Sequence, residues 1–208
     1  VFYFLFKNSK YRLGLIAGLK NNILMSPFSA PFGGFSFKKS DVKIDYLDKA
    51  LILLEEWAQT NKIFKIKFIL PPLFYHGSFI AKEINSLFRA NYTVDQIDLN
   101  FHFETKFLDK NYEQKIWYSA KKSLNRSRNN NLIFQKCQTI SEKELAFKII
   151  EKNRNTKGFP LRMNLSDINI TDEIIKKDFF LVFNDDNKPA ASAIVYYLTH
   201  NTVQVVYW

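Results

Sequence analysis

The sequence is poor in residues that cross-link chains or bind metals. Its 208 residues include one cysteine, Cys137, and three histidines, His76, His102 and His200. A single cysteine excludes a disulfide within the chain and fits the reducing conditions of the cytoplasm. The histidines lie far apart, without the spacing of zinc ligands, so we expect them to be solvated and expect no metal. We interpret Cys137, which lies in a strand-like run, as a core residue.

Long apolar runs and familiar catalytic motifs are also missing. No run approaches the ~20 residues that span a bilayer, so we expect no membrane span. The opening run VFYFLF lacks the basic region and the cleavage site of a signal peptide. The sequence contains no G-x-S-x-G, P-loop or H-E-x-x-H motif, and it therefore identifies no catalytic residue. We expect a cytoplasmic protein.

Positive charge and aromatic residues are abundant. Lysine and arginine number 30 against 20 acidic residues, which gives a net charge of +10, and aromatic residues make up 16% of the chain. Such a charge favours weak, nonspecific binding of polyanions, although lysines spread along the chain also fit a generally basic surface. The run KKSLNRSR is a local basic patch without interleaved aromatic residues. It could face a phosphate or tRNA backbone, or cover a helix between two lobes.

Hydrophobic periodicity predicts alternating strands and helices in the first part of the chain. Residues 1–25 read as a three-stranded meander with Asn and Ser in its turns. Further predicted elements are a helix over Asp45–Gln59, a strand over Ile63–Leu70, a helix capped by Ser78, a strand over Val94–Phe103 and a helix over Tyr112–Arg128. The helix after Ser78 has an apolar stripe made of Ile80, Ala81, Ile84, Leu87 and Phe88.

The pattern starts again after residue 131. A short strand precedes a helix, for which Ser141 and Glu144 have the spacing of a capping box. Three more strands follow at Phe179–Phe183, Ala190–Leu198 and Thr202–Trp208. This second meander repeats the first, with Phe6 matching Phe183 and Ile23 matching Val203, which indicates two copies of one unit. A chance likeness is the alternative, because antiparallel meanders are common.

The order of these elements resembles that of a known family. The segments SPFSAPFGGF (Ser26–Phe35) and NRNTKGFPLRM (Asn153–Met163) also look like stretches of FemAB-like proteins, which belong to the Gcn5-related N-acetyltransferase superfamily. The resemblance implies an α/β (α+β) fold of two tandem lobes, each with a mixed, largely antiparallel sheet flanked by helices. We place the lobes at residues 1–130 and 131–208, joined near Asn129–Asn131.

The resemblance implies an N-acyltransferase that moves an acyl or aminoacyl group to a small-molecule or peptide-like amine. The donor is acetyl-CoA or another acyl-CoA, or alternatively an aminoacyl-tRNA. Val203, Val205 and Tyr207 would lie on the strand that pairs with the pantetheine arm of the coenzyme. The loop that binds its phosphates would follow Trp208. We therefore expect the chain to be the middle of a longer protein, lacking part of each lobe and inactive alone.

The resemblance also suggests two groups of substrate-binding residues. Arg154, Lys157 and Arg162 would border the acceptor site, where guanidinium groups suit a carboxylate or phosphate. Their alternative interpretation is a solvated helix end. Phe32, Gly33 and Gly34 would occupy the loop before the phosphate-binding helix and form a wall of the cleft, unless the loop packs against its own sheet. The alternative function is a non-catalytic protein of the same double fold that binds a cell-wall precursor or RNA.

Overall fold

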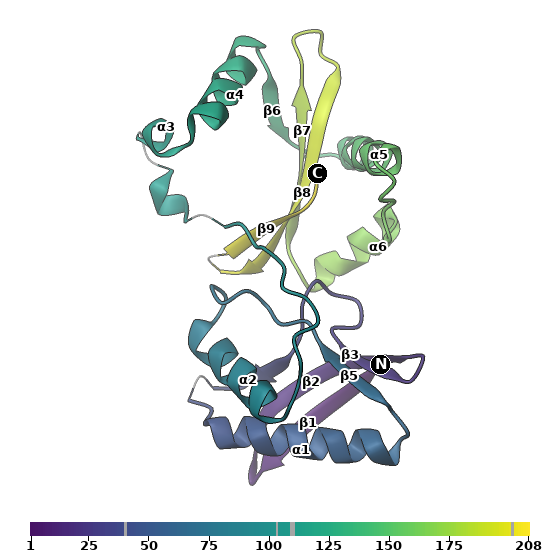
Figure 1. Cartoon of the computed structure of the whole chain (residues 1–208). Helices are drawn as coiled ribbons and strands as arrows, with labels where there is room; N and C mark the ends of the chain where they lie inside the picture. Colours follow the sequence, from purple (N-terminus) through teal and green to yellow (C-terminus); the bar gives the residue numbers. More distant parts are fainter. Residues whose placement is uncertain (40, 103, 109–110, 201) are drawn as a thin grey trace. The chain divides into compact units, whose positions relative to one another are not determined.

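The computed structural model describes residues 1–39, 41–102, 104–108, 111–200 and 202–208. They form two compact units, Val1–His102 and Phe103–Trp208, each with its own sheet and core (Figure 1). The predicted mixed fold with two largely antiparallel sheets is confirmed. The boundary between the units precedes the joint predicted near Asn129–Asn131, because the helices between the two sheets group with the second unit.

The first unit is a five-stranded sheet with two helices on one face. Its strands run in the order β1-β2-β3-β5, with β4 also paired to β2; only β3 and β5 are parallel. The elements are β1 (Phe2–Asn8), β2 (Lys10–Lys20), β3 (Ile23–Ser26), β4 (Phe35–Phe37), α1 (Ile44–Thr60), β5 (Lys65–Phe68) and α2 (Gly77–Arg89). Leu13, Leu15 and Ala17 of β2 are buried with Leu47, Leu51 and Leu54 of α1. The predicted helix at Asp45–Gln59 is thereby confirmed.

The second unit has an antiparallel sheet of order β6-β7-β8-β9. Its elements are η1 (Thr105–Phe107), α3 (Tyr112–Lys115), α4 (Tyr118–Asn129), β6 (Ile133–Lys136), α5 (Ile140–Thr156), α6 (Leu165–Ile170), η2 (Thr171–Glu173), β7 (Lys177–Phe183), β8 (Pro189–Thr199) and β9 (Thr202–Tyr207). Its core is formed by α5, α6, β7 and β8, and it contains Cys137, which is 4% exposed. The prediction that this cysteine is a core residue is confirmed.

The first two strands of the two meanders match in length. The first strands, β1 and β7, have seven residues each, and the second strands, β2 and β8, have eleven. Each first hairpin has a register shift near the end of its first strand, between Phe6 and Lys7 and between Val182 and Phe183. Because a bulge adds an unpaired residue at a defined place, its recurrence in both hairpins strengthens the case for a structural repeat.

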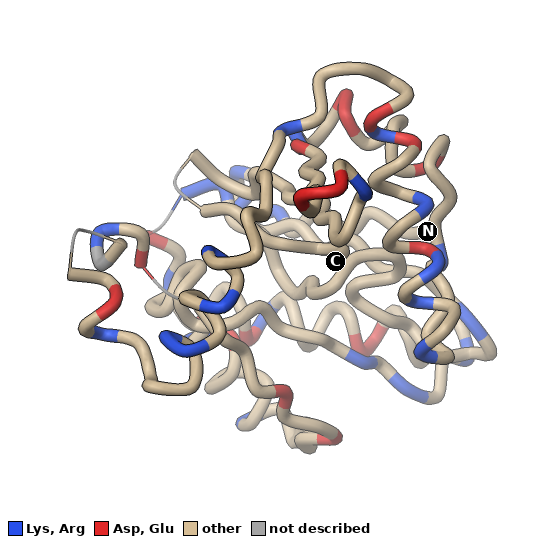
Figure 2. Tube along the Cα trace, turned by 90° about the horizontal axis from the view of Figure 1, so that it is seen from above, with Lys and Arg blue, Asp and Glu red and all other residues tan. Residues whose placement is uncertain are grey.

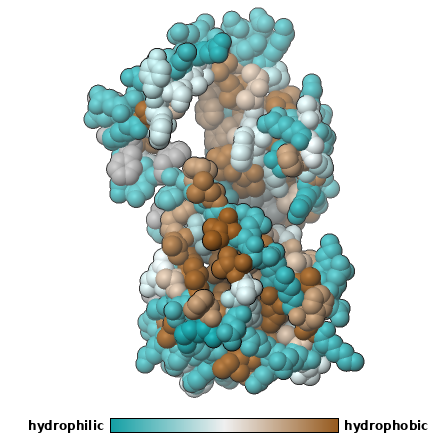
Figure 3. Space-filling view, in the orientation of Figure 1, coloured by the Kyte–Doolittle hydropathy of each residue, from teal (hydrophilic) through white to brown (hydrophobic). Residues whose placement is uncertain are grey.

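The helix α2 is rotated relative to its predicted apolar stripe. Ile84 and Phe88 are 47% and 76% exposed, whereas Phe79, Glu83 and Ser86 are buried with Ile80 and Leu87. The exposed pair lines a shallow apolar groove together with Leu73, Ala81 and Asn85. Figure 3 shows that apolar residues reach the surface on the side of the molecule drawn there.

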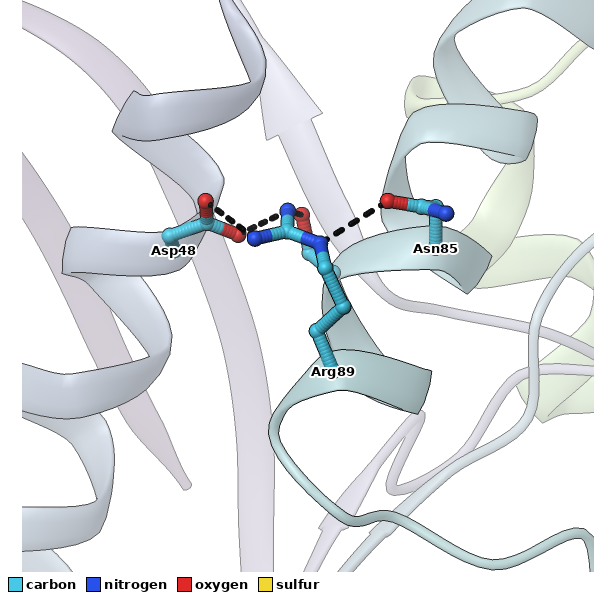
Figure 4. Close-up of polar contacts among 4 residues, drawn as sticks. Asp48, Asn85 and Arg89 are labelled. Atoms are coloured by element: carbon cyan, nitrogen blue, oxygen red, sulfur yellow. Dashed lines mark hydrogen bonds and ion pairs between the residues drawn. The ribbon is translucent and has the colours of Figure 1, made fainter.

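Polar contacts explain this rotation. Arg89 of α2 donates to both carboxylate oxygens of Asp48 of α1, at 2.9 and 2.6 Å, and to Oδ1 of Asn85 at 2.9 Å (Figure 4). Burial alone would raise the pKa of Asp48, but the hydrogen bonds from Arg89 and Ser86 outweigh it and lower the pKa. The ion pair between α1 and α2 therefore favours the rotation that buries Ser86.

Several predicted boundaries are corrected by the structure. His76 rather than Ser78 is the N-cap of α2, and its Nδ1 accepts from the N–H of Phe79. The capping box of α5 uses Thr139 and Glu142, two residues before the predicted pair. The predicted helix over Tyr112–Arg128 is divided into α3 and α4. The predicted strand over Val94–Phe103 is wrong over residues 94–102, which form no strand or helix, and residue 103 lies outside the described part.

The segment Ser26–Phe35 forms the loop between β3 and β4, two short strands that pair with different parts of β2. β2 pairs through Gly18–Lys20 with β3 and through Leu13–Leu15 with β4, so the loop leaves the sheet between the two. The segment therefore does not lead directly into α1 as predicted, because β4 and residues 38–43 follow it. A Cβ at Gly18 would lie 1.9 Å from the ring of Phe28, so this ring packs on the loop's own sheet.

Gly34 closes this loop under two constraints. Its φ is +101°, and a Cβ on it would lie 2.6 Å from Oε1 of Glu83. We predict that Gly34→Ala lowers the free energy of unfolding by about 2 kcal/mol or more, from left-handed strain plus the clash. Urea denaturation would measure the change.

Gly158 provides a matched control for this substitution. Its φ is +76°, but no heavy atom lies within 4 Å of its would-be Cβ. Gly158→Ala should therefore cost only the backbone strain, about 1 kcal/mol. Equal costs for the two substitutions would contradict the close contact between Gly34 and Glu83.

Candidate functional site

The first candidate site lies at the loop between β3 and β4, where the chain leaves the sheet and returns to it. Glu83 of α2 is 1% exposed, and its Oε1 accepts from the N–H of Phe35 at 2.7 Å. Burial raises the pKa of Glu83 to about 7, although the hydrogen bond from Phe35 opposes the shift. A buried carboxyl that titrates near neutrality is a common feature of functional sites.

Ser26 completes the closure of the loop. Its side chain is buried, and its Oγ donates to the carbonyl of Ile16 at 2.8 Å and accepts from the N–H of Gly34 at 3.1 Å. The N–H of Gly33 donates to the carbonyl of Ile69 at 2.7 Å, which ties the loop to the chain just after β5. These bonds hold the loop against its own sheet.

The predicted cleft residues of the loop lie in this closure. Phe32 is half-buried, and its ring centroid lies 5.0 Å from that of Tyr75. Gly33 and Gly34 use their N–H groups within the loop. The contacts are those of the alternative interpretation, a loop packed on its own sheet, and a role as a cleft wall stays a prediction.

The second candidate site lies at the end of α5. Arg154 is half-buried; its Nε donates to the carbonyl of Phe159 at 3.0 Å, and its guanidinium lies 5.8 Å from the centre of the Phe159 ring. Lys157 and Arg162, predicted beside it, are exposed, and no hydrogen bond or ion pair fixes their side chains within the described residues. Of the three predicted cations, only Arg154 has a fixed position.

The end of β9 lies against the same part of α5. Nδ2 of Asn153 donates to the carbonyl of Trp208 at 3.4 Å, and the hydroxyl of Tyr207 donates to Sδ of Met163 at 3.6 Å. Burial raises the pKa of Tyr207, the neighbouring Tyr196 adds to the rise, and the charge of Arg154 opposes it. The structure thus brings together Tyr207 and Arg154, which the sequence analysis assigned separately to donor and acceptor.

Tyr196 was not predicted from the sequence. It is 9% exposed, and its buried hydroxyl has no hydrogen-bond partner among the described residues. Buried polar groups are nearly always hydrogen-bonded, so this hydroxyl is a candidate for contact with a ligand. Tyr196, on β8, lies near Tyr207, which in turn lies near Arg154.

The other predicted donor residues lie on the exposed part of β9. Val203 and Val205 are 52% and 49% exposed. β9 is the last strand of its sheet, and no described strand pairs with its outer edge. An unpaired edge offers N–H and C=O groups to an extended ligand, which is the geometry that the predicted donor site needs.

The remaining sequence candidates have structural roles or none. His76 caps α2 rather than being solvated, and His102 stacks on Phe74 with ring centroids 4.3 Å apart. Within the described residues, no group of three or more His, Cys, Asp or Glu side chains could hold a metal ion. No helix in the same part of the chain is long and apolar enough to cross a bilayer.

Comparisons with protein-family models, with curated protein sequences and with solved structures found no match.

Glu83 was missed because two apolar stripes overlap on α2. It lies three residues after Ile80 and four before Leu87, so it shares a helix face with both. Hydrophobicity alone favours the neighbouring stripe with Ile84 and Phe88. A charged residue flanked on its own face by Phe79, Ile80 and Leu87 was the available signal. Tyr196 carried no such signal, because an alternating strand buries every second residue whatever its role.

The ionisation of Glu83 should make stability depend on pH. Its folded-state pKa of about 7 exceeds the unfolded value of 4.5. The stabilising contribution of Glu83 to the free energy of unfolding is therefore fully present below about pH 4.5, and it is lost as pH rises through about 7. We predict that Glu83→Gln removes this loss and is the more stable protein at pH 8, by on the order of 3 kcal/mol. Urea denaturation at pH 5 and pH 8 measures the effect.

The exposed Glu56 of α1 is the matched control. Glu56→Gln should leave the pH dependence of the native chain in place. If Glu83→Gln kept the same loss of stability between pH 5 and pH 8, the proposed burial of a charge at Glu83 would be wrong.

Proposed function

We propose that the protein is an N-acyltransferase of the FemAB-like type, with two tandem lobes of the Gcn5-related fold. It transfers an acyl or aminoacyl group from a thioester or an aminoacyl-tRNA to an amine, in the cytoplasm. The observation that carries the proposal is the repeated meander, with strands of seven and eleven residues and a bulge near the end of each first strand. A doubled unit of this kind is what the resemblance to the family implies.

The chain's own groups suit the two substrates. The outer edge of β9, with the exposed Val203 and Val205, can bind the extended arm of a donor by strand-like hydrogen bonds. Arg154 can bind an anionic group of the acceptor while its Nε stays on Phe159. We assign these roles by combining the family resemblance with the positions of the residues.

Transfer by such a site requires placement more than a covalent nucleophile. The amine nitrogen forms a bond to the acyl carbon, the bond from that carbon to sulfur or oxygen breaks with its electron pair on the leaving atom, and the proton lost by the amine goes to that leaving group. The hydroxyl of Tyr196 has no acceptor among the described residues and lies near Tyr207, and a donor of this kind can stabilise negative charge that develops on a carbonyl oxygen. Correct placement of two reactants can supply much of the rate enhancement.

The assignment of Arg154 can be tested with a pair of acceptors. A short amine-bearing peptide with a free carboxylate is compared with its carboxamide, using labelled acetyl-CoA or aminoacyl-tRNA as donor. We predict transfer to the carboxylate peptide, with KM for that peptide raised about tenfold in Arg154→Gln by the loss of a charged hydrogen bond. The KM of the donor should not change.

Lys152, exposed on the same helix, is the control. Lys152→Gln should leave the KM of both peptides unchanged. The assay is run on the full-length protein, because residues 1–208 are expected to be inactive alone. There, an absence of transfer from either donor would contradict the proposed activity, and binding of a cell-wall precursor without transfer would favour the non-catalytic alternative. An equal KM change for the peptide and its carboxamide in Arg154→Gln would overturn the role given to Arg154 alone.

A further inference from the structure

The helix α4 contributes no side chain to the core of the second unit. None of its residues is buried, and its twelve residues include four cations, Lys121, Lys122, Arg126 and Arg128, and no acidic residue. Arg128 forms an ion pair with Glu113, whereas the other three cations have no such partner among the described residues. Figure 2 shows lysine and arginine spread along the chain, so what distinguishes α4 is that the helix itself contains no acidic residue.

The unpaired cations share one face of this helix. The face begins at Tyr118 and continues at positions i+3, i+4, i+7, i+8 and i+11, which are neighbours on a helix surface. With Ser123 and Asn130, these residues line a hollow along the helix: Tyr118, Lys121, Lys122, Asn125, Arg126 and Asn129. Hydrogen-bond donors from amides and a phenol therefore alternate with positive charges. We call this face the α4 basic face.

The helix has little intrinsic reason to be stable alone. Isolated helices of about 12 residues are marginal in water, and α4 has no buried side chain to add packing energy. Lys122 and Arg126 are like charges at i and i+4, a spacing that destabilises a helix. A bound polyanion would replace this repulsion with attraction, so the composition of α4 fits a helix that is stabilised by its ligand.

Two exposed aromatic side chains lie at the start of α4: Trp117 is its N-cap residue, and Tyr118 begins the α4 basic face. Trp117 and Tyr118 are 85% and 83% exposed, which is unusual for side chains of this size. The Trp117 carbonyl accepts from the N–H of Lys121, but its side chain takes no part in capping the helix. The ring is therefore not required for the backbone of α4. Exposed rings beside a basic groove are what proteins use to stack unpaired bases while cations bind the phosphates.

We propose that the α4 basic face, with Trp117, binds single-stranded nucleic acid through its phosphates and through base stacking. This surface is separate from the residues assigned to acyl transfer. An anionic lipid surface is the competing partner, but an interfacial helix needs an apolar face to insert, and beyond Tyr118 the α4 basic face consists of Lys, Arg and Asn side chains. In a duplex, neighbouring base pairs cover the faces of the bases, so Trp117 could not stack on them. Stacking on Trp117 therefore favours a single strand.

The charge requirement is tested by salt dependence. Binding of a fluorescent oligouridylate is measured by anisotropy over a salt series for the native chain and for a triple variant with Lys121→Gln, Lys122→Gln and Arg126→Gln. Each phosphate contact contributes about 0.7 to the salt slope of a single strand, so the triple variant should bind more weakly and lose about 2 from the slope.

A control variant removes the same charge elsewhere. Lys49→Gln, Lys148→Gln and Lys152→Gln also remove three positive charges, all from exposed lysines, and these substitutions should leave the slope unchanged. An equal loss in both triple variants would overturn the proposal, because binding would then follow net charge alone.

The stacking requirement is tested with Trp117→Ala and two other polyanions. This variant should bind oligouridylate at least about fivefold more weakly. Its binding to heparin, which has no bases, should not change. Equal weakening for both polyanions would overturn the role of stacking.

If the α4 triple variant lost binding to vesicles of equal parts phosphatidylcholine and phosphatidylserine but kept oligouridylate binding, the partner would be a membrane instead.

Discussion

Pairing of one long strand on both of its edges is the constraint on which each unit depends. β2 pairs with β1 on one side and with β3 and β4 on the other, and β8 pairs with β7 and β9. Each long strand buries one face, through Leu13, Leu15 and Ala17 in β2 and through Ser192, Ile194 and Tyr196 in β8. A slip of one residue would turn the buried face outwards, so the register of every neighbouring strand is fixed by this face.

Both candidate sites follow from that pairing. In the first unit, β3 and β4 share one edge of β2, so the chain between them must leave the sheet and return. Ser26 and Glu83 supply the hydrogen bonds that the returning chain needs. In the second unit, one continuous strand, β9, occupies the equivalent edge of β8, and its end reaches α5 beside Arg154. The same scaffold thus gives a closed loop in one unit and an open edge in the other.

The parts of this fold that rest on periodicity could be predicted from the sequence. The helix α1 and the strands of both meanders have apolar residues at the spacing of one buried face, and turn residues such as Asn21 and Asn22 take positive φ as their type suggests. The rotation of α2 could not be predicted, because two stripes of similar hydrophobicity overlap. Its outcome depends on partners distant in sequence, the N–H of Phe35 and the carboxylate of Asp48.

The candidate site could be predicted only in pieces. Arg154 and Tyr207 were found separately, from a basic joint and from a terminal strand, and their proximity depends on the pairing of β9 with β8. The role of Tyr196 could not be predicted from the sequence, because its position in an alternating strand accounts for its burial without any function. The aromatic partners of the basic run were missed for a local reason: Trp117 and Tyr118 precede the cations instead of alternating with them.

The proposed acyl transfer requires that the outer edge of β9 binds the arm of the acyl donor. Amide hydrogen exchange of the protein with and without acetyl-CoA tests this most directly, since an added hydrogen-bonded partner slows exchange of the strand it covers. We predict slower exchange in Thr202–Tyr207 on addition of the coenzyme, with no change in Phe2–Asn8 of β1. Binding of acetyl-CoA that protects another segment and leaves β9 unchanged would contradict the claim.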